Sequence, residues 1–323
     1  MPQQFPYIVA DIGGTNARFG LVTEQQSENG QLVIENKQKY PSDSFVNIEQ
    51  AVQKYLSSLN GESIGGACLA VAGPITGDTV RLTNLNWAFS VNDVKRTLAL
   101  PKLKVLNDFA AYAFATPYVP NEHLLSLNEG QAIDGCPIAI VGPGTGFGVA
   151  ALVPQANRWN VLPTEGGHIT LAAKTPLQAS IISVMSHEFS HISVERVLSG
   201  PGIRNLYKAL AKVEGVEVEP LRSSDITAKA LSNEHSLEYR TLRLFCAWLG
   251  QTCGNLALTL GARGGVYLGG GVLLKFTEFL QQSEFLNCFF AKGQMQEYLH
   301  QMPVKLVTEG NSALLGAAAW YLD

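Results

Sequence analysis

The sequence predicts an α/β protein built from two similar halves, and three observations lead to this class. Apolar strand-like runs at 7–10 and 19–22, with a weaker run at 32–34, are typical of an antiparallel meander. Strand-like and helical segments alternate after it. A second strand–turn–strand layout begins near residue 138, and 323 residues suffice for about two domains of roughly 150 residues each.

The first half follows from local patterns. A helix is expected over 48–59, where Ile48, Val52 and Tyr55 recur on one helical face. Later elements follow in the same way: a strand at 66–71, a turn at Gly73 and Pro74, a helix at 91–98, a strand at 104–106 and a helix of small residues at 109–115.

The second half repeats the opening layout. Strands are expected at 138–141 and 149–153, and residues 8–22 align with 139–153 without gaps. Thr175, Pro176 and Gln178 form a helix start with a capping box. A long helix at 240–260, a strand at 266–268 and a C-terminal helix of small residues complete the chain. Small faces let two helices approach closely, as the C-terminal and 109–115 helices would if they crossed at a hinge, but ordinary well-packed helices have the same composition.

The composition indicates a compact globular protein and excludes several classes. Apolar residues make up 46% of the chain, and the formal net charge is -4. No long Lys/Arg run supports nucleic-acid binding. Neither a signal peptide nor a membrane span of about 18 apolar residues is evident. Five scattered cysteines without a Cys-x-x-Cys pair favour buried, reduced thiols in a cytoplasmic protein.

Three glycine-rich turns, each after an apolar strand, predict a nucleotide site. They are Gly13 with Gly14, residues 142–148, and residues 269–271. Glycine lets phosphate approach backbone N–H groups closely. A P-loop is absent, and "GPGTGFG" leads into a strand rather than the helix that a Rossmann fingerprint requires. We therefore expect the hairpin turns themselves, without a helix dipole, to hold the phosphates.

The side chains at these turns suit MgATP. Asp11 can hold Mg²⁺ directly or through water, and Thr15, Asn16 and Thr145 can bind phosphate oxygens. The expected nucleotide-binding set is Asp11, Gly13, Gly14, Thr15, Asn16, Gly144, Thr145, Gly146, Gly269 and Gly270.

Seven motifs along the chain together resemble bacterial ATP-dependent glucokinases of the hexokinase-like, actin-type ATPase superfamily. They are "DIGGTNAR", "NDF", "GPGTGFGVA", "EGGH", "ERVLSGPG", "GGVYLGGGV" and "LLGAAA". The resemblance implies a two-domain actin-like ATPase (ribonuclease H-like) fold with an interdomain cleft. It also implies a small domain of residues 1–118 plus 309–323, a large domain of residues 119–308, and a homodimer. The ROK sugar kinases usually carry a zinc-binding cluster of cysteines soon after the Glu-x-Gly-His motif. In this chain the corresponding residues 169–185 contain no Cys, so the resemblance is not to the zinc-containing ROK type.

Five polar residues are candidates for binding a hexose, whose hydroxyls both donate and accept hydrogen bonds. The resemblance makes Asn107, Asp108, Glu165, His168 and Glu195 the sugar-binding set, and it places Asp108 as catalytic base. The implied reaction transfers the γ-phosphoryl group of MgATP to the 6-hydroxyl of D-glucose, giving glucose 6-phosphate and ADP.

Several alternatives stay open at this point. Asp108 or Glu195 could instead cap a helix. The chain could phosphorylate another hexose, use ADP or polyphosphate, or sense sugar without turnover. "HEFSH" at 187–191 matches a zinc-protease pattern, but a break expected at 192–194 argues against helical spacing of the two histidines.

Overall fold

The fold comes from a computed structural model, which describes residues 5–23, 32–82, 85–155, 158–308 and 312–322. The chain forms two compact units. Unit 1 contains residues 1–121 and 311–323, and unit 2 contains residues 122–310. Among the described residues, no helix has both the length and the apolar character to cross a membrane.

Unit 1 is built on a five-stranded sheet with the order β3-β2-β1-β4-β8. β1 pairs antiparallel with β2 and parallel with β4, and β4 pairs parallel with β8. The sheet strands are β1 (Tyr7–Ile12), β2 (Asn16–Val22), β3 (Glu35–Pro41), β4 (Gly66–Val71) and β8 (Leu103–Asn107). A separate small sheet contains β5 (Ile75–Thr76), β6 (Thr79–Arg81) and β7 (Ala88–Ser90).

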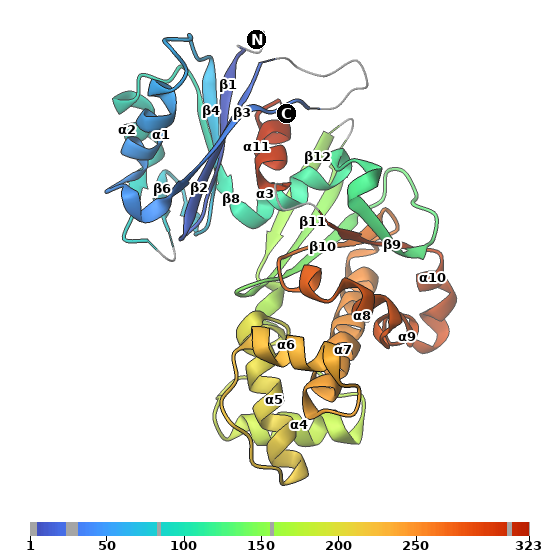
Figure 1. The fold of residues 1–323 in the computed structure, drawn as a ribbon. Coiled ribbons are helices and arrows are strands. Elements are labelled where there is room, and N and C mark those ends of the chain that lie inside the picture. Colours follow the sequence, from blue (N-terminus) through green and yellow to red (C-terminus); the bar gives the residue numbers. More distant parts are fainter. Residues whose placement is uncertain (1–4, 24–31, 83–84, 156–157, 309–311, 323) are drawn as a thin grey trace. The chain divides into compact units, whose positions relative to one another are not determined.

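Both faces of this sheet are covered by helices. Alternating side chains of β1 divide between two cores: Ile8 and Ala10 lie on one face, Tyr7 and Val9 on the other. Helices α1 (Ile48–Ser57) and α2 (Val91–Thr97) cover the first face, and α3 (Asp108–Ala115) and α11 (Ser312–Leu322) cover the second (Figure 1). The near-continuous apolar runs in the sequence reflect burial on both faces.

Helices α3 and α11 pack closely through their small residues, as expected. A Cβ on Gly316 would collide with the carbonyl oxygen of Ala111, so only glycine allows the observed approach. The backbones can come this near because the facing positions carry almost no side chain.

Unit 2 repeats the same five-strand connection. Its sheet has the order β12-β11-β10-β13-β14-β9, in which β10, β11 and β12 form an antiparallel meander. β13 and β14 then follow in parallel beside β10, as β4 and β8 do beside β1. The strands are β9 (Leu124–Glu129), β10 (Ile138–Pro143), β11 (Phe147–Gln155), β12 (Arg158–Thr164), β13 (Gly265–Leu268) and β14 (Pro303–Val307). This shared topology supports the two similar halves expected from the sequence.

Helices of unit 2 pack around α7 (Leu237–Leu260), which contributes Phe245 and Trp248 to the core. Figure 1 shows α4, α5 and α6 gathered near α7. The other helices are α4 (Pro176–Ser186), α5 (Gly200–Glu214), α6 (Ser223–Ser232), α8 (Thr277–Gln282), α9 (Phe285–Phe290) and α10 (Gln296–His300). The capping box expected at the start of α4 is present.

Three sequence expectations need correction. The third strand is Glu35–Pro41 and not 32–34, because β3 is a polar edge strand without an apolar signal. The gapless alignment of the two halves slips by one residue after the turn, because Ile12 pairs with Ala17 whereas Pro143 pairs with Phe147. Not every cysteine is buried: Cys136 and Cys288 are only partly so, although all five are free thiols.

Candidate functional site

In unit 1, three candidate residues lie at the carboxyl ends of strands. Asp11 is near the end of β1, Asn107 ends β8, and Asp108 follows it as the first residue of α3. β4 separates these strands and ends with the small residues Ala70 and Val71, which pair with Asp11 and Asn107 respectively. This edge of an α/β sheet is where ligands usually bind.

Asp108 is the most strongly perturbed carboxyl group of this edge. Burial, with a smaller contribution from the charge of Asp11, raises its pKa from 3.8 to about 6. A hydrogen bond to Oδ1 from the backbone N–H of Phe109, at 2.8 Å, opposes this rise. A carboxylate with a pKa close to neutrality is better matched to general-base chemistry than an ordinary aspartate.

Asn107, and not Asp108, is the N-cap of α3. Its Oδ1 accepts from the backbone N–H groups of Phe109 at 2.9 Å and Ala110 at 3.2 Å. Its Nδ2 donates to the carbonyl of Gly73 at 3.3 Å. The helix-cap alternative for Asp108 is therefore wrong, and Asn107 keeps one amide N–H for a ligand.

Asp11 forms an ion pair that the sequence did not indicate. Arg18, opposite it on β2, donates from Nη1 to Oδ2 at 2.8 Å. Burial raises the pKa of Asp11 and Arg18 lowers it. Oδ1 has no hydrogen-bond partner among the described residues, so it can serve Mg²⁺ or its water. Mg²⁺ commonly takes one or two carboxylates and completes its shell with waters and substrate phosphates, so this donor set fits.

The first glycine turn spans residues 13–16 and presents free polar side chains. The N–H of Gly13 donates to the carbonyl of Asn16 at 3.0 Å. Ser42, which the sequence reading missed, fixes the turn by donating from Oγ to the carbonyl of Gly13 at 2.7 Å. No described residue forms a side-chain hydrogen bond with Thr15 or Asn16, so both remain available to a ligand.

The second turn, residues 144–146, is tied to Glu195. The carboxylate Oε2 accepts from the backbone N–H of Phe147 at 2.8 Å. A Cβ on Gly146 would come within 2.5 Å of the same oxygen, so a larger residue here would displace the Glu195 carboxylate. Ser193 caps the short turn that carries Glu195, so capping by Glu195 is wrong. Glu195 therefore links the expected sugar set to the expected phosphate turn, where Thr145 is exposed.

A helix N-terminus adjoins this turn, contrary to the expectation of hairpins alone. The N–H of Gly200, the first residue of α5, donates to the carbonyl of Gly144 at 2.8 Å. Ser199 is the N-cap and accepts from Gly202. The positive end of the α5 dipole thus lies beside the turn and favours an anion there. The sequence signal was available in "SGPG", a serine cap followed by proline.

The third turn packs directly on the second. Gly269 continues the ladder by donating to the carbonyl of Val141 at 2.9 Å. Gly270 has φ +87°, and a Cβ there would also collide with the carbonyl of Pro143. Both the backbone conformation and the close approach at position 270 therefore favour glycine. Because β10 and β13 are paired in parallel, the turns that follow them lie side by side.

His168 ends a short turn, η4 (Gly166–His168), and Glu165 is the N-cap immediately before it. Their side chains are largely exposed, with Nε2 of His168 at 3.8 Å from Oε2 of Glu165. A Cβ on Gly167 would collide with the carbonyl of Phe147, so the backbone of η4 lies close to the end of the second turn. Nε2 of His191 contacts the carbonyl of His168 at 2.9 Å.

The zinc-protease pattern does not form a metal site. α4 ends at Ser186 with His187 as its C-cap, so the two histidines of "HEFSH" do not share a helical face. Across the described ranges, no group of three or more His, Cys, Asp or Glu side chains could hold a metal ion.

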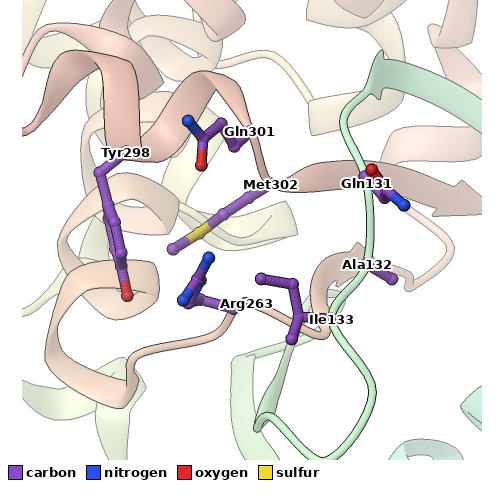
Figure 2. A pocket seen from close by; sticks show the side chains of 7 residues that line it. All are labelled: Gln131, Ala132, Ile133, Arg263, Tyr298, Gln301 and Met302. Atoms are coloured by element: carbon purple, nitrogen blue, oxygen red, sulfur yellow. The ribbon is translucent and has the colours of Figure 1, made fainter.

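One sizeable hollow of unit 2 is separate from all of these residues. A cavity of about 530 Å³ is lined by Arg263, Tyr298 and Met302, with Gln131 and Ile133 across from them (Figure 2). It lies where β13 and β14 begin, whereas the glycine turns follow the opposite ends of the strands. None of the candidate site residues lines it.

Comparison with known proteins decides the family. The profile of the Glucokinase family matches residues 8–323. The chain belongs to the Glucokinase family. A glucokinase from Saccharophagus degradans is 44% identical over 316 residues, covering 98% of both chains. Glucose phosphorylation is the activity that this relationship supports.

Solved structures of glucokinases share the fold. The crystal structure of a glucokinase from an Antarctic psychrotroph aligns with a TM-score of 0.93 at 45% identity over 99% of both chains. A ROK family glucokinase from Streptomyces griseus, solved with glucose and AMPPNP, aligns with a TM-score of 0.59 at 20% identity over 97% of this chain and 98% of the other. The fold is the two-domain, actin-like ATPase fold expected from the sequence.

Proposed function

We propose that the chain transfers the γ-phosphoryl group of ATP to the 6-hydroxyl of D-glucose, giving glucose 6-phosphate and ADP. The observation that carries the proposal, beside the family relationship, is Asp108. It is a half-buried carboxyl group at the carboxyl end of β8, and its pKa is raised to about 6. About nine-tenths of such a group is ionised at pH 7, so it can accept a proton there.

In the proposed reaction, the 6-oxygen of glucose forms a bond to the γ-phosphorus while the bond to the bridging oxygen of ATP breaks. The hydroxyl proton moves to the carboxylate of Asp108, and ADP leaves with the bridging oxygen. Asn107, Glu165, His168 and Glu195 would orient the sugar hydroxyls, which makes attack effectively intramolecular. The sugar and phosphate roles divide between the two units, so the proposal requires both units to reach the same substrates.

The three glycine turns would hold the phosphates. Two observations support this assignment. No described residue forms a side-chain hydrogen bond with Thr15 or Asn16 in the first turn, and the α5 N-terminus lies beside Gly144 in the second. Asp11 would hold Mg²⁺, directly or through water, with its Oδ1. When bound, Mg²⁺ would neutralise phosphate charge as the γ-phosphoryl group moves.

Further parts of the proposal rest on the family resemblance. They are domain boundaries at 1–118 with 309–323 and at 119–308, an interdomain cleft, a homodimer and a cytoplasmic location. The nucleotide set also includes Gly13, Gly14, Thr145, Gly146, Gly269 and Gly270. The glucokinase from Streptomyces griseus was solved with AMPPNP, which supports ATP as donor.

A coupled assay across sugars and donors tests the function. D-Glucose with MgATP should give the highest kcat/KM among glucose, mannose, fructose and N-acetylglucosamine, and ADP or polyphosphate should not replace ATP. Equal rates on several hexoses would refute glucose specificity. Sugar binding without turnover in every combination would favour a sensing protein instead.

A further inference from the structure

A second, smaller hollow of unit 2 lies between the segment after His168 and helix α7. Its volume is about 230 Å³, several times the roughly 30 Å³ of one water in the liquid. Lys174 and Lys292 line it together with Trp248, Gln251, Thr252 and Asn255. No aspartate or glutamate is among its lining residues.

The two lysines bring positive charge to the hollow, and no carboxylate of the described residues pairs with either. Nζ of Lys174 donates to the carbonyl of Ala291 at 3.1 Å. Nζ of Lys292 donates to the carbonyl of Gln251 at 3.0 Å and to Oδ1 of Asn255 at 2.6 Å. An ammonium group has three donors, so donors remain on both side chains. Burial lowers the pKa of Lys292 first and the charge of Lys174 lowers it next, so the two charges repel each other.

Thr252 supplies an independent indication of a ligand. It is 5% exposed and lines the hollow. Three other helical threonines, Thr227, Thr241 and Thr259, donate to the carbonyl four residues earlier. Within the described part of the chain, the Thr252 hydroxyl has no such partner. A hydroxyl that lines a hollow and makes no bond to its own helix can donate to a ligand there.

We propose that this hollow binds a small oxyanion carrying two negative charges. Lys174 and Lys292 would donate to its oxygens from two sides, and Thr252 would donate from the floor. An anion would relieve the repulsion between the lysines and accept from the Thr252 hydroxyl at once. Phosphate and small dicarboxylates share this chemistry.

The hollow is continuous with the proposed sugar-binding segment. Ile169 and Leu171 form backbone hydrogen bonds with Val194 and Ile192, and Thr170 bridges to Ser193. His168 immediately precedes one of these segments, and Glu195 immediately follows the other. A bound anion would hold this pairing and preorganise both side chains. This consequence for sugar binding rests on the proposed function, whereas anion binding does not.

Tryptophan fluorescence can report the binding directly. Trp248 lines the hollow, and its Nε1 donates to the carbonyl of Ala172 at 3.0 Å. The chain is titrated with sodium phosphate and, separately, with sodium malonate, at an ionic strength held constant with sodium chloride. We expect saturable binding of one or both, with phosphate alone indicating phosphoryl ligands and malonate alone indicating dicarboxylates. No saturable signal with either, checked by calorimetry, would overturn the proposal.

Variants localise the site. Lys174→Gln and Thr252→Val should each weaken binding about tenfold or more, whereas Lys208→Gln, an exposed lysine of α5, should bind as the wild type does. Equal affinity in all four proteins would also overturn the site, and Thr252→Val keeps the test valid if Lys174→Gln folds poorly. The anion should lower the KM for glucose in the wild type but not in Lys174→Gln. An unchanged KM refutes the coupling alone, and absent turnover refutes the proposed function while the binding result stands.

Discussion

Replacing Asp108 by asparagine should abolish turnover while making the protein more stable at neutral pH. Asparagine keeps an oxygen for the hydrogen bond from Phe109, but it cannot accept the proton of the sugar hydroxyl. We therefore expect kcat to fall by about 10²–10⁴, the usual contribution of a general base. The affinity for glucose should change little.

The gain in stability follows from the raised pKa. The folded state holds the proton of Asp108 up to about pH 6, whereas an unfolded aspartate releases it near 3.8. Folding the ionised group therefore costs up to about 3 kcal/mol above pH 7, at about 1.4 kcal/mol per pKa unit. This cost appears as the pH rises from 4 through 6 and is nearly absent below pH 4. Asp108→Asn removes it.

Thermal and urea unfolding at pH 8 and at pH 4.5 measure the effect, and activity and calorimetric glucose binding are measured in parallel. The variant should be more stable than the wild type at pH 8, with a much smaller difference at pH 4.5. Asp43→Asn, the same change at an exposed position of unit 1, should alter neither activity nor stability. Near wild-type turnover of Asp108→Asn would refute the base, and lower stability at pH 8 would refute the raised pKa.

Three further predictions concern the same elements. The kcat/KM of the wild type should fall tenfold per pH unit below about pH 6, because Asp108 becomes protonated there; a limb near pH 4 would contradict this. Gly146→Ala should lower the melting temperature and raise the KM for ATP, because its Cβ would push the Glu195 carboxylate away from the N–H of Phe147 and so loosen the second turn. Gly144→Ala has open space at its Cβ, so it should leave the melting temperature unchanged. Its methyl group would still occupy space beside the proposed phosphate position, so the KM for ATP should rise. Gly316→Ala should cost about 1–3 kcal/mol of stability through overpacking, measured by urea unfolding; an unchanged midpoint would contradict the close helix contact.

Elements with strong local signals could be predicted from the sequence. The capping box of α4 is contained in Thr175 and Gln178, and β4 has a bounded apolar run at 66–71. The polar edge strand β3 has no such signal, because its stability comes from pairing with β2 rather than from burial. Periodicity therefore cannot detect it.

Interactions between residues that are far apart in the chain could not be predicted from the sequence, because they depend on strand register and on the fold. The bond from Arg18 to Asp11 depends on the register of β1 against β2. The bond from Phe147 to Glu195 joins residues 48 positions apart. Chemistry could nominate Glu195, because carboxylates suit sugar hydroxyls, but only the fold reveals that one of its oxygens already holds the second glycine turn.

The central claim is transfer of a phosphoryl group from ATP to the 6-hydroxyl of glucose by this chain. ³¹P NMR of the purified protein with D-glucose and MgATP follows every phosphorus atom during the reaction. Glucose 6-phosphate and ADP should appear in equal amounts as ATP disappears, and neither should form with Asp108→Asn. Release of inorganic phosphate in place of glucose 6-phosphate, or intact ATP after long incubation with the wild type, would contradict the claim.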